Sequence, residues 1–114
     1  MPAGHPAAGA AAATALAVLL VAACGSSGAG SETKDAIAAA KHAYAKAKAS
    51  GEDLAPGPCI AERLPGLAAW VADIAHDPRT AADDAPSNQC ARFRSGAATH
   101  FVELTPDGHL IRAQ

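Results

Sequence analysis

Histidine and acidic side chains are the first candidates for chemistry in this chain. Four of the five histidines follow residue 23, namely His42, His76, His100 and His109. His76 stands directly before Asp77, and such a pair resembles half of a catalytic dyad. Adjacent residues of an extended segment point to opposite sides, however. We therefore expect His76 and Asp77 not to act together.

Two groups of side chains contain residue types that could bind a metal ion. His100 and Glu103 are three residues apart on an expected strand, so their side chains leave opposite faces. The expected bulged turn also places His100 and His109 on opposite faces, whereas a plain two-residue turn would place them on the same face and allow metal binding. The carboxylates of Asp77, Asp83 and Asp84 crowd one loop, but they lack the spacing of a calcium-binding EF-hand loop. A solvated acidic loop, with Asp84 as a helix cap, is the expectation. The sequence predicts no metal and no cofactor.

The composition and the missing motifs exclude several classes of function. The chain contains no Gly-x-Ser-x-Gly, no HExxH and no glycine-rich phosphate loop. A net charge of −2 and only 4% aromatic residues argue against a nucleic-acid partner. The sequence therefore predicts that the protein is not an enzyme. The alternative is a small metal-handling protein or hydrolase of the cell envelope that uses His76, Asp77 and the acidic loop.

A cysteine near the N-terminus carries the most specific motif. Residues Ala7 to Ala23 are uncharged and apolar, and they are followed by Cys24-Gly25-Ser26-Ser27. The stretch is short for a bilayer span, which needs about 20 apolar residues, and it suits the apolar region of an export signal. Val21-Ala22-Ala23-Cys24 resembles the lipobox of bacterial lipoproteins, an aliphatic residue and two small residues before a cysteine.

The resemblance implies how the chain is processed and where it goes. It makes residues 1–23 a lipoprotein signal peptide and Cys24 the mature N-terminus and the site of lipidation, with a diacylglycerol on its thiol. Two or three acyl chains, at about 0.8 kcal/mol for each buried methylene, hold a protein on the membrane. The expected location is the extracytoplasmic face of the cell membrane. The alternative is an alanine-rich buried helix that ends in a core cysteine.

The other two cysteines then form a pair. With Cys24 acylated, Cys59 and Cys90 remain, and outside the cytoplasm such a pair usually oxidises. A disulfide between them would close a loop of the chain. Because this cross-link restricts the unfolded state, it stabilises the fold by roughly 3.5–4 kcal/mol. A two-cysteine metal site and a reactive thiol are the alternatives, and no CxxC spacing favours the metal.

The first segments after the lipobox are expected to be a tether and a helix. Residues 24–30 are rich in Gly and Ser and predict a flexible tether. Alanine dominates residues 31–50, which predicts a helix with Ser31 as N-cap and Gly51 as stop. One face of this helix is apolar, formed by Ile37, Ala40, Tyr44 and Ala47. A row of lysines, Lys34, Lys41 and Lys48, offers a solvated face or a contact with anionic lipids.

The C-terminal half is expected to be mostly β-structure. Residues 70–76 fit a helix or a strand, and the strand is slightly favoured; residues 87–94 predict a short helix. Residues 100–104 and 109–112 flank Thr105-Pro106-Asp107-Gly108, which predicts a hairpin with a type I turn and a G1 bulge. The expected fold is α+β: residues 31–114 form one small domain, in which the helix packs on an antiparallel sheet and a disulfide ties the region 51–114.

The C-terminal half also resembles small exported bacterial proteins of unknown function. The residues that carry this resemblance are Asp73-Ile74-Ala75-His76-Asp77-Pro78-Arg79, Asn88-Gln89-Cys90 and His100-Phe101-Val102-Glu103-Leu104. The resemblance implies no activity. A lipid anchor, a tether and a small disulfide-linked domain together predict a membrane-anchored binding or interaction module. Its partner could be a protein of the cell envelope.

Overall fold

The computed structural model describes residues 17–114, with side chains from residue 30 onward. The chain divides into two units, Met1–Ser31 and Glu32–Gln114, and the fold described below is that of the second unit. Most of the predicted signal peptide, and the side chain of Cys24, lie outside the described part of the chain. The lipobox therefore stays a prediction.

Helix α1 (Ala17–Ala49) starts earlier than predicted. The segment 24–30, predicted as a flexible tether, is helical here, and Ser31 lies inside the helix instead of capping it. Once a helix has a nucleus, it extends at a small cost, about 1 kcal/mol for a Gly relative to Ala. The predicted stop is confirmed, because Gly51 has a φ of 80° and its N–H donates to the Lys48 carbonyl at 3.1 Å.

The sheet has four strands in the order β1-β2-β3-β4, which is also their order along the chain. They are β1 (Cys59–Ala61), β2 (Trp70–Ile74), β3 (His100–Leu104) and β4 (Leu110–Ala113). The strand favoured for residues 70–76 is confirmed as β2. The prediction of an antiparallel sheet is wrong in part, because β2 and β3 run parallel while the two outer pairs are antiparallel.

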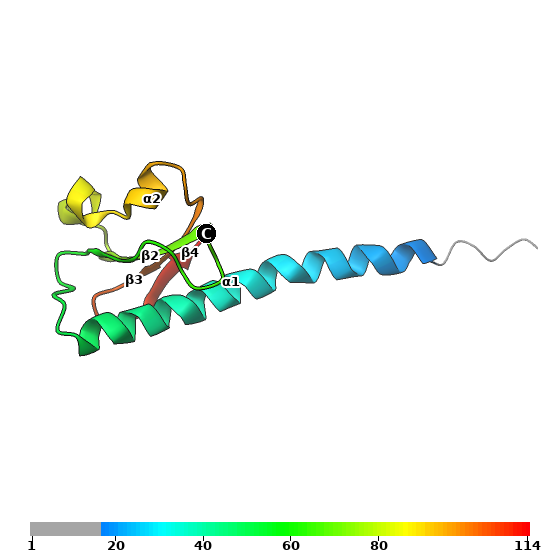
Figure 1. Ribbon diagram of the computed structural model, residues 1–114, viewed down its shortest axis with the longest axis horizontal. Helices are drawn as coiled ribbons and strands as arrows, with labels where there is room; N and C mark the ends of the chain where they lie inside the picture. The colour runs from blue at the N-terminus through cyan, green and yellow to red at the C-terminus, as the bar shows by residue number, and fades with distance from the viewer. Residues whose placement is uncertain (1–16) are drawn as a thin grey trace, which may run out of the picture. The chain divides into compact units, whose positions relative to one another are not determined.

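The connection between β2 and β3 explains the parallel pair. Parallel neighbours need a crossover of a dozen or more residues, whereas a hairpin needs only a short turn. Residues 75–99 supply this crossover and contain η1 (Ala81–Asp84), η2 (Pro86–Asn88) and α2 (Ala91–Arg94). Figure 1 shows this segment, in yellow and orange, on the side of the sheet that faces away from α1.

The short helix predicted over residues 87–94 is broken in two. Gln89 and Cys90 are extended between η2 and α2. Cys90 is bonded to Cys59 and buried against the sheet, so its position is set by the disulfide and not by helix propensity. Helix α2 begins after it because the Glu62 carboxylate accepts the N–H groups of Ala91 and Arg92, each at 2.9 Å.

The core lies between α1 and the sheet. Ala36 and Ala40 are fully buried, and their small side chains bring the helix backbone close to the sheet. Their partners come from β2, β3 and the preceding loops: Leu54, Leu64, Trp70, Ala72, Ile74, Val102 and Leu104. A second, smaller cluster on the opposite face joins Val71, Cys90 and Ala98. The predicted packing of an alanine-rich helix on a small sheet is confirmed.

The predicted hairpin is also confirmed. Leu104 pairs with Leu110, as the turn requires. Gly108 has a φ of 89° and donates its N–H to the Thr105 carbonyl at 2.8 Å, while the Thr105 N–H donates to the His109 carbonyl at 2.8 Å. These bonds form a type I turn with a G1 bulge. Tyr44 of α1 covers the turn and donates its hydroxyl to the Pro106 carbonyl at 2.9 Å.

Candidate functional site

A cavity of about 370 Å³ lies on the face of the sheet that carries the crossover. Strand alternation places it there: Val71 and Asp73 of β2 and Phe101 and Glu103 of β3 all point to this face. The parallel register sets Asp73 directly beside Glu103. Two acidic groups therefore meet at the base of one cavity, although they are thirty residues apart in the sequence.

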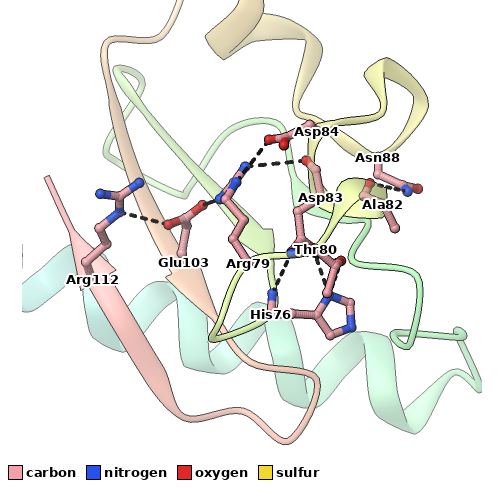
Figure 2. A network of polar contacts seen from close by, with 9 residues as sticks. All are labelled: His76, Arg79, Thr80, Ala82, Asp83, Asp84, Asn88, Glu103 and Arg112. Carbon is pink, nitrogen blue, oxygen red and sulfur yellow. Dashed lines mark hydrogen bonds and ion pairs between the residues drawn. The ribbon is translucent and has the colours of Figure 1, made fainter.

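Glu103 is buried and is held by two arginines. Arg79, from the crossover, donates Nη1 to Glu103 Oε2 at 2.9 Å, and Arg112, from β4, donates Nε to Oε1 at 2.9 Å. Figure 2 shows the Glu103 carboxylate between the two guanidinium groups, with Arg79 also contacting Asp84. The ion pairs with Glu103 and Asp84 raise the pKa of Arg79 above its ordinary value. The two ion pairs hold the Glu103 carboxylate in place.

Asp73 is the opposite case. Burial, together with the neighbouring charge of Glu103, raises the pKa of Asp73 to about 8, although Arg79 acts against the shift. Its Oδ1 atom is shut off from solvent and has no hydrogen-bond partner among the described residues. A buried polar atom without a partner is costly in a fold and common at functional sites. The raised pKa favours the protonated form of Asp73, which can donate as well as accept a hydrogen bond.

The rim of the cavity is aromatic and cationic. Phe93 of α2 is 41% exposed and meets Phe101 edge-on, with the ring centroids 5.2 Å apart. Arg112 lies over the Phe101 ring, with its guanidinium carbon 5.2 Å from the centroid. Arg94 also lines the cavity, and within the described residues its guanidinium has no hydrogen bond or ion pair. The arrangement offers an apolar wall, a guanidinium without a partner among the described residues and a carboxyl group with a raised pKa.

Replacing Asp73 with Asn should stabilise the fold, and increasingly so as the pH rises. In the unfolded chain Asp73 ionises near 3.8, whereas in the fold its pKa is about 8. The folded protein therefore loses stability between about pH 4 and pH 8, and Asn removes that loss. After a discount for partial exposure, we expect a gain on the order of 1–3 kcal/mol near pH 8 in urea unfolding.

The control for this variant is Asp35→Asn, which changes the same charge on the exposed surface of α1. Such a surface change should alter the free energy of unfolding by less than about 0.5 kcal/mol. Equal pH profiles for wild type and Asp73→Asn would contradict the assignment of a raised pKa to Asp73.

The histidines and loop aspartates singled out by sequence have other partners. Asp77 is exposed, and His76 contacts Asp83, with Nδ1 and Oδ1 2.9 Å apart. Asp83 is buried and also accepts the backbone N–H of Thr80 at 2.9 Å. Asp84 turns away to Arg79. The three carboxylates of this loop do not converge, and Figure 2 shows Asp83 and Asp84 directed to different partners.

His100 and His109 are kept apart by the sheet. His100 stacks on Trp70, with the ring centroids 4.7 Å apart, while Glu103 faces the cavity on the other side, as strand alternation predicts. His109 is exposed in the hairpin and, with His76, lines a shallow cavity of about 510 Å³. Sequence reasoning did not pair these two histidines because they are far apart in the sequence. The crossover brings them to the same cavity only in the folded chain.

The cysteine pair is confirmed as a disulfide between Cys59 and Cys90. Among the described residues, one group of three metal-ligating side chains has its ligand atoms within 4.8 Å of one another, and it consists of Cys59, Glu62 and Cys90. Both sulfur atoms are joined in the disulfide, so they carry no thiolate that a metal could bind. Glu62 instead caps α2.

Sequence reasoning missed the residues of the cavity. The available signal was the placement of Asp73 and Glu103 inside two apolar strands, at positions where a charge is costly to bury. The three arginines gave no such signal, because isolated arginines are common on any surface.

Comparison of the chain with protein-family models, curated protein sequences and solved structures found no match. Within residues 17–114, no helix has both the length and the apolar character needed to cross a membrane. The function is therefore inferred from the residues and geometry of this chain.

Proposed function

We propose that the protein is a membrane-anchored extracytoplasmic lipoprotein whose small domain binds a ligand in the cavity on the sheet. Two features support the location: the lipobox at Cys24, and a disulfide of the kind that persists outside the cytoplasm. The lipid holds the chain at the membrane, and the domain presents its cavity to the surrounding medium.

The observation that carries the binding role is the grouping of a carboxyl group, an exposed phenyl ring and a free arginine around one cavity. Asp73 and Phe93 line this cavity together with Arg94, which has no ion pair among the described residues. Small-molecule sites combine apolar walls with a few convergent polar groups in this way. A ligand that contacts the Asp73 carboxyl group and Arg94 and covers Phe93 would use all three side chains at once.

Binding is tested by titrating the purified full chain with three phenyl compounds of different charge: 3-phenylpropionate, 3-phenylpropionamide and 3-phenylpropylamine. Saturable shifts of the backbone amide signals of Val71 and Phe101, which lie in the cavity wall, are the expected result for at least one compound. If none of the three moves these signals while they are otherwise well resolved, the cavity does not bind small molecules and this part of the proposal fails.

Anchoring is tested by Cys24→Ser. Serine offers no thiol to the diacylglycerol, so we expect the protein to leave the detergent-soluble membrane fraction and to appear in secreted or unprocessed forms. Wild type should incorporate a fatty-acid analogue and yield an acylated N-terminal peptide that begins at Cys24. Ser26→Ala is the matched control and should stay in the membrane. An intact Met1 terminus with a free Cys24 thiol in wild type would contradict the lipoprotein assignment.

A metal-handling or hydrolytic role at His76 is the second candidate. The contact between His76 Nδ1 and the buried Asp83 fixes the imidazole, as in many catalytic and metal-bound histidines, and His109 lies across the same shallow cavity. Elemental analysis of the chain purified without chelators decides this point. A stoichiometric metal ion that His76→Ala removes would favour the second candidate over the first.

A further inference from the structure

The size of the sheet cavity limits what it can hold. Its volume of about 370 Å³ is at the lower end of the range for small-molecule sites, about 300–1,000 Å³. The rim is formed by side chains of α2 and the sheet, with Phe93 and Phe101 as its apolar surface. A ligand of this size with one flat apolar part would cover both rings.

The charges around the cavity favour an anion. Three arginines line it, and two of them, Arg79 and Arg112, are paired with Glu103. Arg94 is the third, and no carboxylate among the described residues neutralises it. Asp73 contributes no negative charge while it is protonated. Arg79 also pairs with Asp84, so the charge left without a partner is that of Arg94, which repels a cationic ligand and attracts an anion.

The free donors of the cavity suit a carboxylate. Arg94 has no hydrogen-bond partner among the described residues, and Arg112 uses Nε on Glu103, so its two Nη groups are free as well. A carboxylate has two oxygens in one plane, which matches the planar fork of a guanidinium.

On the basis of the proposed binding function, we propose that the cavity binds a small carboxylic acid with an aromatic or branched apolar body. Its carboxylate contacts Arg94 and Asp73, and its apolar body lies against Phe93 and Phe101. Each of the two contacts combines a side chain of α2, Phe93 or Arg94, with a side chain of the sheet. Only the folded and disulfide-linked crossover places them together.

The three phenyl compounds named above test this proposal, because they share one body and differ in charge. We expect 3-phenylpropionate to bind at least about tenfold more tightly than 3-phenylpropionamide, since the amide loses the charge-assisted hydrogen bond to Arg94. We expect 3-phenylpropylamine to bind more weakly still. Equal affinity for acid and amide, or tighter binding of the amine, would overturn the carboxylate proposal while leaving a binding cavity in place.

Arg94→Gln tests the residue itself. The Arg94 side chain is exposed and makes no hydrogen bond among the described residues, so its loss should not disturb the fold. It should weaken 3-phenylpropionate by about tenfold and leave the amide unchanged. Arg63→Gln, an exposed arginine outside this cavity, removes the same charge and should change the affinity by less than about twofold. If both variants lose the same affinity for 3-phenylpropionate, the positive charge of the protein attracts the anion without a specific contact. That result would overturn the assignment of Arg94.

Discussion

Replacing both Cys59 and Cys90 with Ala should destabilise the domain by roughly 3.5–4 kcal/mol, measured as the free energy of urea unfolding. The disulfide joins residues 31 positions apart, and without it the unfolded chain gains the entropy of that open loop. Cys90 is also buried against Val71 and Ala98, so its truncation leaves a small void. The loss is a large part of the 5 kcal/mol or so typical of a small domain.

The expected consequence is a midpoint of thermal unfolding lowered by roughly 15 °C or more. The single variant Cys24→Ala is the matched control, since it removes a cysteine but leaves the bond between Cys59 and Cys90. It should unfold with the wild-type midpoint. A loss of less than about 1 kcal/mol in the double variant would mean that the crossover is held by its other contacts.

Asp83→Ala should cost about 3–4 kcal/mol, although the residue sits in a loop. Asp83 is 1% exposed and accepts the N–H groups of His76 and Thr80 and the Thr80 hydroxyl. Its removal leaves these donors without their acceptor. Gly57 packs so closely that an added Cβ would lie 2.6 Å from Asp83 Oδ1, which shows how little space surrounds the carboxylate. Urea unfolding near pH 7 measures the loss.

Asp84→Ala is the control, because this neighbouring carboxylate is exposed and pairs with Arg79 at the surface. It should cost less than about 1 kcal/mol. If the two variants lose stability equally, Asp83 does not organise the loop.

Acid titration separates Asp83 from other contributions. Burial opposes its ionisation, but hydrogen bonds from Thr80 and His76 lower the pKa of Asp83 to about 2. Its stabilisation is therefore complete above the ordinary pKa of 3.8 and is lost as the pH falls from about 4 to about 2. Wild type should lose about 2 kcal/mol over this range on account of Asp83, and Asp83→Ala should not.

Local features of the fold followed from the sequence. Pro106 and Gly108 predict the hairpin. Proline fixes φ at the first central position of the turn, and glycine permits the positive φ that the turn needs two residues later. The end of α1 at Gly51 has the same cause. The sequence of β2 favours a strand over a helix only slightly, because a short apolar run fits both the strand period and the helix period. The disulfide followed from the count of cysteines, together with the assignment of Cys24 to a lipid.

Other features depended on contacts between distant segments. The direction of β3 relative to β2 is set by the crossover of residues 75–99, and alternation within a strand carries no information on its neighbour's direction. The break before α2 depends on the disulfide at Cys90 and the cap from Glu62, which no local pattern contains.

The sequence by itself determined the turns, the helix stop, the alternation that separates His100 from Glu103, and the pairing of Cys59 with Cys90. These depend on backbone angles, periodicity and composition, which are local. Only the tertiary structure decided that Asp73 lies beside Glu103, and that Arg79, Arg94 and Arg112 surround them. That cavity arises because a long crossover folds back over one face of the sheet, and charge and burial act through space and not along the chain.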